Sequence, residues 1–191
     1  VRTMLRDLAP WMRIMDALSD LEFARQGLVD TPVVITNHAA GFANAGIPHW
    51  VYTCCYPRGG FVNRLFDSPL AAIRLHGALF YRQRAKGYLH WGYNYWYKGL
   101  GRDLIDPFTV PDSGNWPLFS AGDPFIVYPG PDGPLDSIRW EVLAEGLQDY
   151  ALFETLGMSP DDSRLSPLRG YADVPRNPDW IGSLRRQLLR R

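Results

Sequence analysis

The residues best suited to ligand chemistry lie in one short stretch, GYLHWGYNYWY at positions 87–97. This stretch holds six aromatic rings and one histidine, whereas a buried strand is usually rich in Val, Ile and Leu. Aromatic faces stack on the C–H faces of sugar rings, and amide side chains beside them bond sugar hydroxyls. We therefore expect a carbohydrate-binding wall, with aromatic filling of a wide core as the competing interpretation. The expected sugar contacts are Trp91, Tyr93, Asn94 and Trp96.

Acidic residues would be needed for glycoside cleavage, which usually employs two carboxyl groups roughly 5 to 10 Å apart. The adjacent acids Asp161 and Asp162 lie in a polar tail, where a catalytic role is disfavoured. Other aspartates lie near predicted strand or loop ends, where an aspartate more often bonds its own backbone than performs chemistry. No pair in the sequence therefore stands out as catalytic. The aspartates considered are Asp16, Asp20, Asp106 and Asp123.

Metal and cofactor chemistry finds little support in the sequence. The four histidines lack the close spacing of a zinc site. Cys54 and Cys55 are adjacent, so a disulfide between them would be strained, and we expect them to be small core residues. In the run DSIRWE, a helix cap and ion pairs explain Ser137, Arg139 and Glu141 better than catalysis does. We predict no metal and no cofactor.

The bulk composition is that of a globular protein. The chain has 191 residues, of which 46% are hydrophobic, enough for a substantial core. Twenty basic residues balance twenty acidic ones, so no overall charge attracts nucleic acid or an anionic membrane. No apolar run approaches the roughly 20 residues of a membrane-spanning helix. The chain begins with Val1 and not with Met or a signal sequence, so we expect its natural amino terminus to be missing.

Strand patterns alternate with helix patterns, which predicts an α/β fold with a parallel sheet and ligands at the carboxyl ends of its strands. A doubly wound sheet and a (β/α)8 barrel both fit this order. A complete barrel typically needs about 250 residues, so the length favours an incomplete one. The predicted strands are 13–18, 32–36, 49–55, 87–93 and 124–130, and the predicted helices are 2–12, 21–26, 37–46, 68–84 and 137–157.

Several blocks in the same order resemble one enzyme family. They are HWVYTCCYPRGGFVNRLFDSPLAAIRLHGALFYRQRAKGYLHWGYNYW, then DPF, then GDPFIVYPGPDGPLDSIRWEVLAEGLQDYALF. From about Pro10 to Leu156 the chain resembles the carboxyl-terminal part of the catalytic domain of glycoside hydrolase family 123, together with related bacterial proteins of uncharacterised specificity. The resemblance implies that residues 1–157 are the later βα units of a (β/α)8 barrel, followed by a peripheral tail with a short helix over residues 158–191.

The resemblance also implies a β-N-acetylgalactosaminidase-like hydrolase with a retaining, substrate-assisted mechanism. In that mechanism the sugar acetamido oxygen attacks the anomeric carbon, a glutamic acid protonates the leaving oxygen and a preceding aspartate orients the acetamido group. This sequence contains no Asp-Glu dipeptide, so we expect the pair upstream of Val1 and a chain that is inactive alone.

The alternative function is a non-catalytic carbohydrate-binding protein. The expected partners are a carbohydrate and the missing amino-terminal part of the same protein. The sequence does not indicate a compartment, although related polysaccharide-degrading enzymes are often secreted or periplasmic. A second group of expected sugar contacts consists of Tyr52, Asn63, Arg64 and Tyr128.

Overall fold

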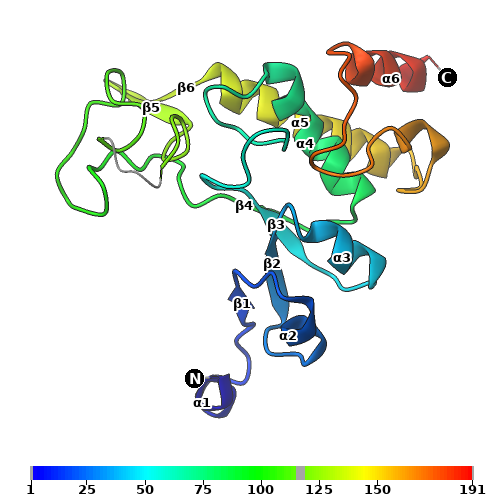
Figure 1. The fold of residues 1–191 in the computed structure, drawn as a ribbon, viewed down its shortest axis with the longest axis horizontal. Coiled ribbons are helices and arrows are strands. Elements are labelled where there is room, and N and C mark those ends of the chain that lie inside the picture. The colour runs from blue at the N-terminus through cyan, green and yellow to red at the C-terminus, as the bar shows by residue number, and fades with distance from the viewer. Residues whose placement is uncertain (1, 115–118, 191) are drawn as a thin grey trace.

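The fold is built on a parallel sheet, and the computed structural model describes residues 2–114 and 119–190 (Figure 1). Neighbouring strands follow each other along the chain in the order β1-β2-β3-β4, and each pair is parallel. The expected α/β class with a parallel sheet is thereby confirmed. The strands are β1 (Met15–Asp16), β2 (Thr31–Ile35), β3 (Trp50–Tyr52) and β4 (Tyr88–Leu89).

The helices lie close to their predicted positions, and the side chains of Asp20 and Ser137 cap the amino termini of two of them. Ser137 accepts a hydrogen bond from the backbone N–H of Trp140 at 3.2 Å and so caps the longest helix, as predicted. The helix that follows Ser68 begins without a side-chain cap, because Pro69 occupies the cap position. The helices are α1 (Arg2–Leu8), α2 (Leu21–Arg25), α3 (Ala39–Asn44), α4 (Leu70–Arg82), α5 (Ile138–Thr155) and α6 (Trp180–Leu189), with a 3-10 turn at Ser163–Leu165.

The predicted fifth parallel strand is wrong. Its carboxyl-terminal half forms β5 (Val127–Gly130), which pairs antiparallel with β6 (Gly133–Asp136) in a separate two-stranded sheet. Gly133 has a φ of +144°, a backbone conformation open to glycine, and this lets the chain reverse after two connecting residues. The apolar pattern identified a strand but carried no information about its partner.

The predicted strand over residues 87–93 is also shorter than expected. After Leu89 the chain leaves the parallel sheet, and Asn94 forms an isolated antiparallel bridge with Phe125. The carbonyl of Tyr93 accepts the backbone N–H of Ile126 at 2.9 Å. The aromatic stretch is therefore mostly a loop, attached to the segment that leads into β5.

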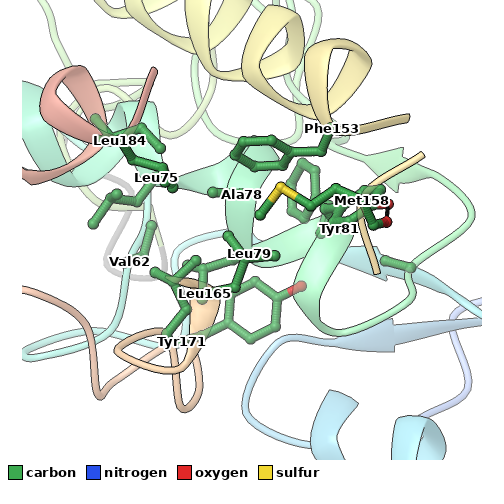
Figure 2. Close-up of a cluster of buried hydrophobic side chains, with 14 of the residues drawn as sticks. Val62, Leu75, Ala78, Leu79, Tyr81, Phe153, Met158, Leu165, Tyr171 and Leu184 are labelled. Atoms are coloured by element: carbon green, nitrogen blue, oxygen red, sulfur yellow. Dashed lines mark hydrogen bonds between the residues drawn. The ribbon is translucent and has the colours of Figure 1, made fainter. Parts of the chain in front are cut away.

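The main hydrophobic core lies between α4, α5 and the carboxyl-terminal segment (Figure 2). Leu79 of α4 and Phe153 of α5 are almost fully buried in it. The expectation of a peripheral tail over residues 158–191 is wrong in this respect, because apolar residues of that tail complete the core. The buried tail residues are Met158, Leu165, Leu168, Tyr171, Ile181, Leu184 and Leu188. Their wide spacing among Pro, Asp and Arg hides them from a periodicity argument.

The amino-terminal elements of the fold are much more exposed to solvent than the rest. Neither α1 nor α2 buries a residue, and both residues of β1 are exposed. Among the described residues, β1 pairs only with β2 and leaves its other edge open. No helix in residues 2–114 and 119–190 is both long and apolar enough to cross a membrane.

Two glycines let α4 and α5 approach backbone to backbone. A Cβ atom at Gly77 would lie 1.7 Å from the carbonyl oxygen of Gly146, which no rearrangement of a side chain could relieve. We expect Gly77→Ala to lower the free energy of unfolding by about 3 kcal/mol, because the helices must separate. Urea denaturation would measure this loss.

Gly41→Ala in α3 is the matched control. No atom lies within 4 Å of a Cβ at Gly41, so this variant should be unchanged or up to about 1 kcal/mol more stable. Equal stability of the two variants would contradict the close crossing of α4 and α5.

Candidate functional site

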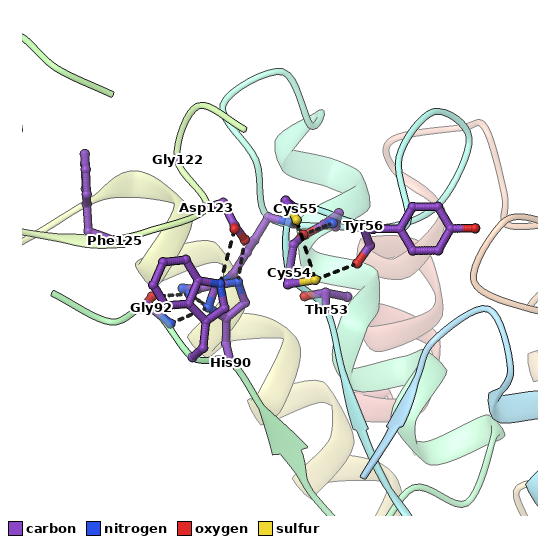
Figure 3. A network of polar contacts seen from close by, with 12 residues as sticks. Thr53, Cys54, Cys55, Tyr56, His90, Gly92, Gly122, Asp123 and Phe125 are labelled. Carbon is purple, nitrogen blue, oxygen red and sulfur yellow. Dashed lines mark hydrogen bonds and ion pairs between the residues drawn. The ribbon is translucent and has the colours of Figure 1, made fainter. Parts of the chain in front are cut away.

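Polar residues gather at the carboxyl ends of the parallel strands, where α/β proteins bind their ligands. Thr53 and Cys54 follow β3, and His90 and Trp91 follow β4. Figure 3 shows this edge, with Asp123 reaching His90 from the loop before β5. The carboxyl edge is therefore the candidate site.

Asp123 lies at the centre of a buried polar network. Its side chain is fully buried, and each of its two carboxylate oxygens receives one hydrogen bond. His90 Nε2 lies 3.1 Å from Oδ1, and the indole Nε1 of Trp91 donates to Oδ2 at 3.2 Å. One carboxylate thus fixes two neighbouring residues of the aromatic loop.

The hydrogen bonds define the protonation state of His90. Its Nδ1 accepts the backbone N–H of Gly92 at 3.1 Å and also a hydrogen bond from the guanidinium of Arg64, so Nδ1 carries no proton. The proton of the neutral ring is then on Nε2 and points at Asp123. Burial is the main cause that lowers the pKa of His90 to about 4, although the bond to Asp123 opposes it. His90 therefore holds the network together in its neutral form.

Two buried arginines hold the backbone and the side chains of this network through hydrogen bonds. Arg64 also donates to the carbonyl of Gly92, and its burial lowers the pKa of the guanidinium. Arg139 donates to the carbonyls of Arg64 at 2.6 Å and of Gly122 and Phe125 at 2.9 Å. The first turn of α5 thereby fastens the loop that carries Asp123. Arg139 is a structural clamp that acts through hydrogen bonds to carbonyls, whereas the run DSIRWE predicted ion pairs.

Gly92 makes the contact between the two loops possible. A Cβ atom at this position would lie 2.4 Å from the carbonyl oxygen of Pro124 and 2.8 Å from that of Asp123. A larger residue would push the loop of Asp123 away from the loop of His90. The glycine in the aromatic stretch is thus explained by close backbone approach.

The four expected sugar contacts lie along one loop but differ in exposure. Trp91 is 38% exposed and Tyr93 is 43% exposed, and Asn94 is also exposed. Trp96 is half-buried against the smaller core cluster, and its indole donates to the carbonyl of Val127 at 3.1 Å. Three of the four side chains therefore present surface to solvent, and Trp96 shares its surface with the core.

The second group of expected contacts is less accessible. Asn63 is buried and donates to the carbonyls of Cys54 at 2.9 Å and Pro57 at 3.1 Å. Arg64 is buried in the network described above. Tyr52 is the half-buried last residue of β3, and its burial raises the pKa of its hydroxyl. Tyr128 lies in β5, outside the parallel sheet, with its ring stacked on Phe108 at 5.1 Å.

The sequence alone did not bring His90 and Asp123 together. The two residues are 33 positions apart, and no local pattern in the sequence links them. The structure also brings Asn37, after β2, towards the hydroxyl of Tyr56 at 3.4 Å. The available signal was a histidine next to a tryptophan within the predicted strand 87–93.

The adjacent acids of the tail have structural partners. Asp161 pairs with Arg82 at 2.7 Å and also with Arg84, and these contacts lower the pKa of its carboxyl. Asp162 pairs with Arg164 at 2.6 Å. Asp161 therefore fastens the tail to the end of α4, and Asp162 bonds within the tail.

A cavity of about 570 Å³ lies at the opposite edge of the sheet, around the amino ends of its strands. Trp11, Arg13, Trp50 and Lys86 are among its lining residues. We place the candidate site at the carboxyl edge nevertheless, because the buried network and the half-exposed aromatic side chains are there.

The fold and this edge define an α/β protein whose candidate ligand site lies at the carboxyl edge of a parallel sheet. A solved structure with a TM-score of 0.62 and 16% sequence identity is that of a family 123 glycoside hydrolase from Clostridium perfringens, studied for glycolipid glycan hydrolysis. The match covers 93% of this chain and 34% of that one, so this chain spans about a third of its length. At this identity the likeness shows the fold alone.

The sequence comparison identifies the family. The family described as glycoside hydrolase 123, catalytic domain, matches residues 1–156, which is most of the chain. The chain therefore belongs to glycoside hydrolase family 123, as its sequence blocks suggested. No curated protein sequence matches it.

Buried neutral histidines predict a pH dependence of stability. Burial lowers the pKa of both His90 and His76 to about 4, below the value of 6.5 for an unperturbed histidine. Between these values the unfolded chain binds more protons than the folded chain, so the free energy of unfolding should fall as pH decreases. Each histidine contributes a slope of up to about 1.4 kcal/mol per pH unit.

Urea unfolding between pH 7.5 and pH 5 would measure this slope, above the range in which most carboxyl groups titrate. A free energy of unfolding that is constant over this range would contradict the neutral buried state of His90 and His76.

Proposed function

We propose that this chain is part of a glycoside hydrolase that cleaves β-linked glycosides, with N-acetylgalactosamine as the expected sugar. Family membership supports the class of reaction. The observation that carries the proposal is the row of aromatic side chains after β4, beside a buried network that fixes their loop. Rigid aromatic faces at the carboxyl edge of a parallel sheet suit the stacking of a sugar ring.

The proposed architecture is the later part of a (β/α)8 barrel. The open edge of β1 and the uncovered α1 and α2 support it, because a barrel would supply further strands and helices there. The chain spans about a third of the similar hydrolase, which leaves room for the remaining units. We propose that a preceding segment of a longer polypeptide supplies them.

The proposed mechanism is retaining and assisted by the substrate. The sugar acetamido group acts as the nucleophile, so one acid and one orienting aspartate are sufficient. The sequence has no Asp-Glu dipeptide to supply them, and we propose that both residues lie in the preceding segment. The chain itself would then bind and orient the sugar.

We propose that Trp91, Tyr93, Asn94 and Trp96 contact the sugar directly. Trp91 and Tyr93 offer exposed ring surface, and the exposed amide of Asn94 is free to bond hydroxyls. Tyr52 and Tyr128 are secondary contacts in this proposal. Asn63 and Arg64 act indirectly, because their hydrogen bonds are made within the protein.

A non-catalytic carbohydrate-binding protein is the second candidate. The absence of an Asp-Glu dipeptide from the sequence favours it, since the same aromatic loop would bind sugar without cleaving it. Both candidates use the same binding residues and differ in the origin of the catalytic acid.

An activity comparison separates the two candidates. We expect a longer polypeptide that contains this chain to cleave aryl β-glycosides, first among them the β-N-acetylgalactosaminide, and the 191-residue chain alone to cleave none. Cleavage by the chain alone would contradict the upstream location of the acid. Sugar binding without cleavage by the longer form would favour the second candidate.

Removal of an aromatic contact should weaken sugar recognition. We expect Trp91→Ala to lower kcat/KM of the longer form by roughly tenfold or more, equivalent to about 1.4 kcal/mol of lost stacking. Trp11→Ala is the matched control, because Trp11 is 80% exposed at the opposite edge of the sheet. An equal loss of kcat/KM in both variants, with thermal stability unchanged, would contradict the proposed contact between Trp91 and the sugar.

A further inference from the structure

We propose that Asp123 is a positioning residue that sets the orientation of the Trp91 ring for sugar recognition. The proposal deepens the function given above and rests on it. Asp123 is fully buried and touches no solvent, so it acts through the groups that it bonds. One of these is Nε1 of Trp91, whose ring is 38% exposed. A buried charge thus controls a side chain at the surface.

The hydrogen-bond geometry requires a carboxylate at position 123. Its Oδ1 faces the Nε2–H of His90, and its Oδ2 faces the indole N–H of Trp91. Both neighbours are donors, because His90 Nδ1 already accepts from Gly92 and an indole has no acceptor. An ionised carboxylate is the one form of this side chain whose two oxygens both accept. An amide of the same shape would leave two donors facing each other.

The other side of the network prevents Asp123 from moving. His90, its first partner, is held in turn by Gly92 and Arg64. The backbone of Asp123 donates to the carbonyl of Ser120 at 3.0 Å, and Arg139 bonds the carbonyl of the preceding Gly122. The carboxylate is therefore a fixed point against which the indole is held.

The Trp91 ring has apolar neighbours, but its orientation depends on the hydrogen bond from its indole N–H to Asp123. Phe119 lies 4.6 Å from the Trp91 ring centroid at an angle of 31°, and Tyr95 meets the ring edge-on at 5.1 Å. Such apolar contacts tolerate small rotations of the ring about χ1 and χ2, whereas a hydrogen bond to Nε1 is directional and restricts them. A sugar that stacks on Trp91 then meets a ring whose orientation is already set, which lowers the entropic cost of binding.

The first test reads the orientation of Trp91 without any sugar. In the 191-residue chain labelled with ¹⁵N, the Trp91 indole N–H signal is identified by its loss in Trp91→Phe. We expect Asp123→Asn to shift this signal strongly and broaden it. Asp149→Asn is the matched control, because Asp149 is also fully buried but pairs with Arg74 and Arg185 in the helical layer. An unshifted Trp91 signal in Asp123→Asn would overturn the proposal.

The second test asks whether the effect on sugar passes through Trp91. The probe is N-acetylgalactosamine, titrated into the chain and its variants. We expect Asp123→Asn to raise the Kd about three- to tenfold, and to have no further effect when Trp91 is already Phe. Asp149→Asn should leave the Kd unchanged. Additive effects of Asp123→Asn and Trp91→Phe would overturn the proposal.

The two tests also separate this proposal from the proposed function. If Asp123→Asn shifts the Trp91 signal but the unaltered chain does not bind the sugar, the orienting role of Asp123 stands and the sugar site fails. If Asp123→Asn does not fold, Trp91→Phe alone gives the second measure. In Trp91→Phe, the Nε2–H signal of His90 should change, because the carboxylate of Asp123 that both residues share loses one donor. An unchanged signal would overturn the proposed link between Asp123 and Trp91.

Discussion

The carboxyl edge of this protein depends on one buried carboxylate. Asp123 has no contact with solvent, and such a charge is stable only when hydrogen bonds and opposite charge surround it. His90 and Trp91 supply the hydrogen bonds, and Arg64 supplies the nearby positive charge. These groups come from three segments that are distant in sequence. The loops must fold correctly to bring the charged groups together, and the contacts between these groups in turn hold the loops in place. A change in any one segment would leave a buried polar group without its partner.

This dependence explains how a loop can present a rigid aromatic surface. The parallel sheet ends at Leu89, the third residue of the predicted strand, and most of the aromatic stretch follows it. Its backbone is fixed by the bridge to Phe125 and by the bond from Ile126 to Tyr93. Arg139, at the start of α5, holds the opposing loop through three carbonyls. Arg139 therefore connects the helical layer to the site, and the close crossing of α4 and α5 fixes the position of the helix that carries it.

Local patterns in the sequence predicted the elements but not their partners. The β-branched run at residues 32–36 and the capped helix from Ser137 are correct, because propensity and capping are local properties. The carboxyl-terminal half of the segment 124–130 is a strand, yet it pairs with residues 133–136, since strand pairing depends on contacts that a single run does not contain. The aromatic stretch was recognisable as a candidate site from its composition. Its dependence on Asp123 was not, because a buried ion network leaves no periodic trace in the sequence. The sugar contacts themselves remain a proposal.

The most direct test of this account is a crystal structure of the longer polypeptide with N-acetylgalactosamine bound. We predict that the sugar stacks on the ring of Trp91 at the carboxyl ends of the parallel strands, with Asp123 bonded to the indole beneath it. A sugar bound elsewhere, for example at the amino-terminal edge around Trp11 and Trp50, would contradict the account. It would leave the aromatic loop with a purely structural role.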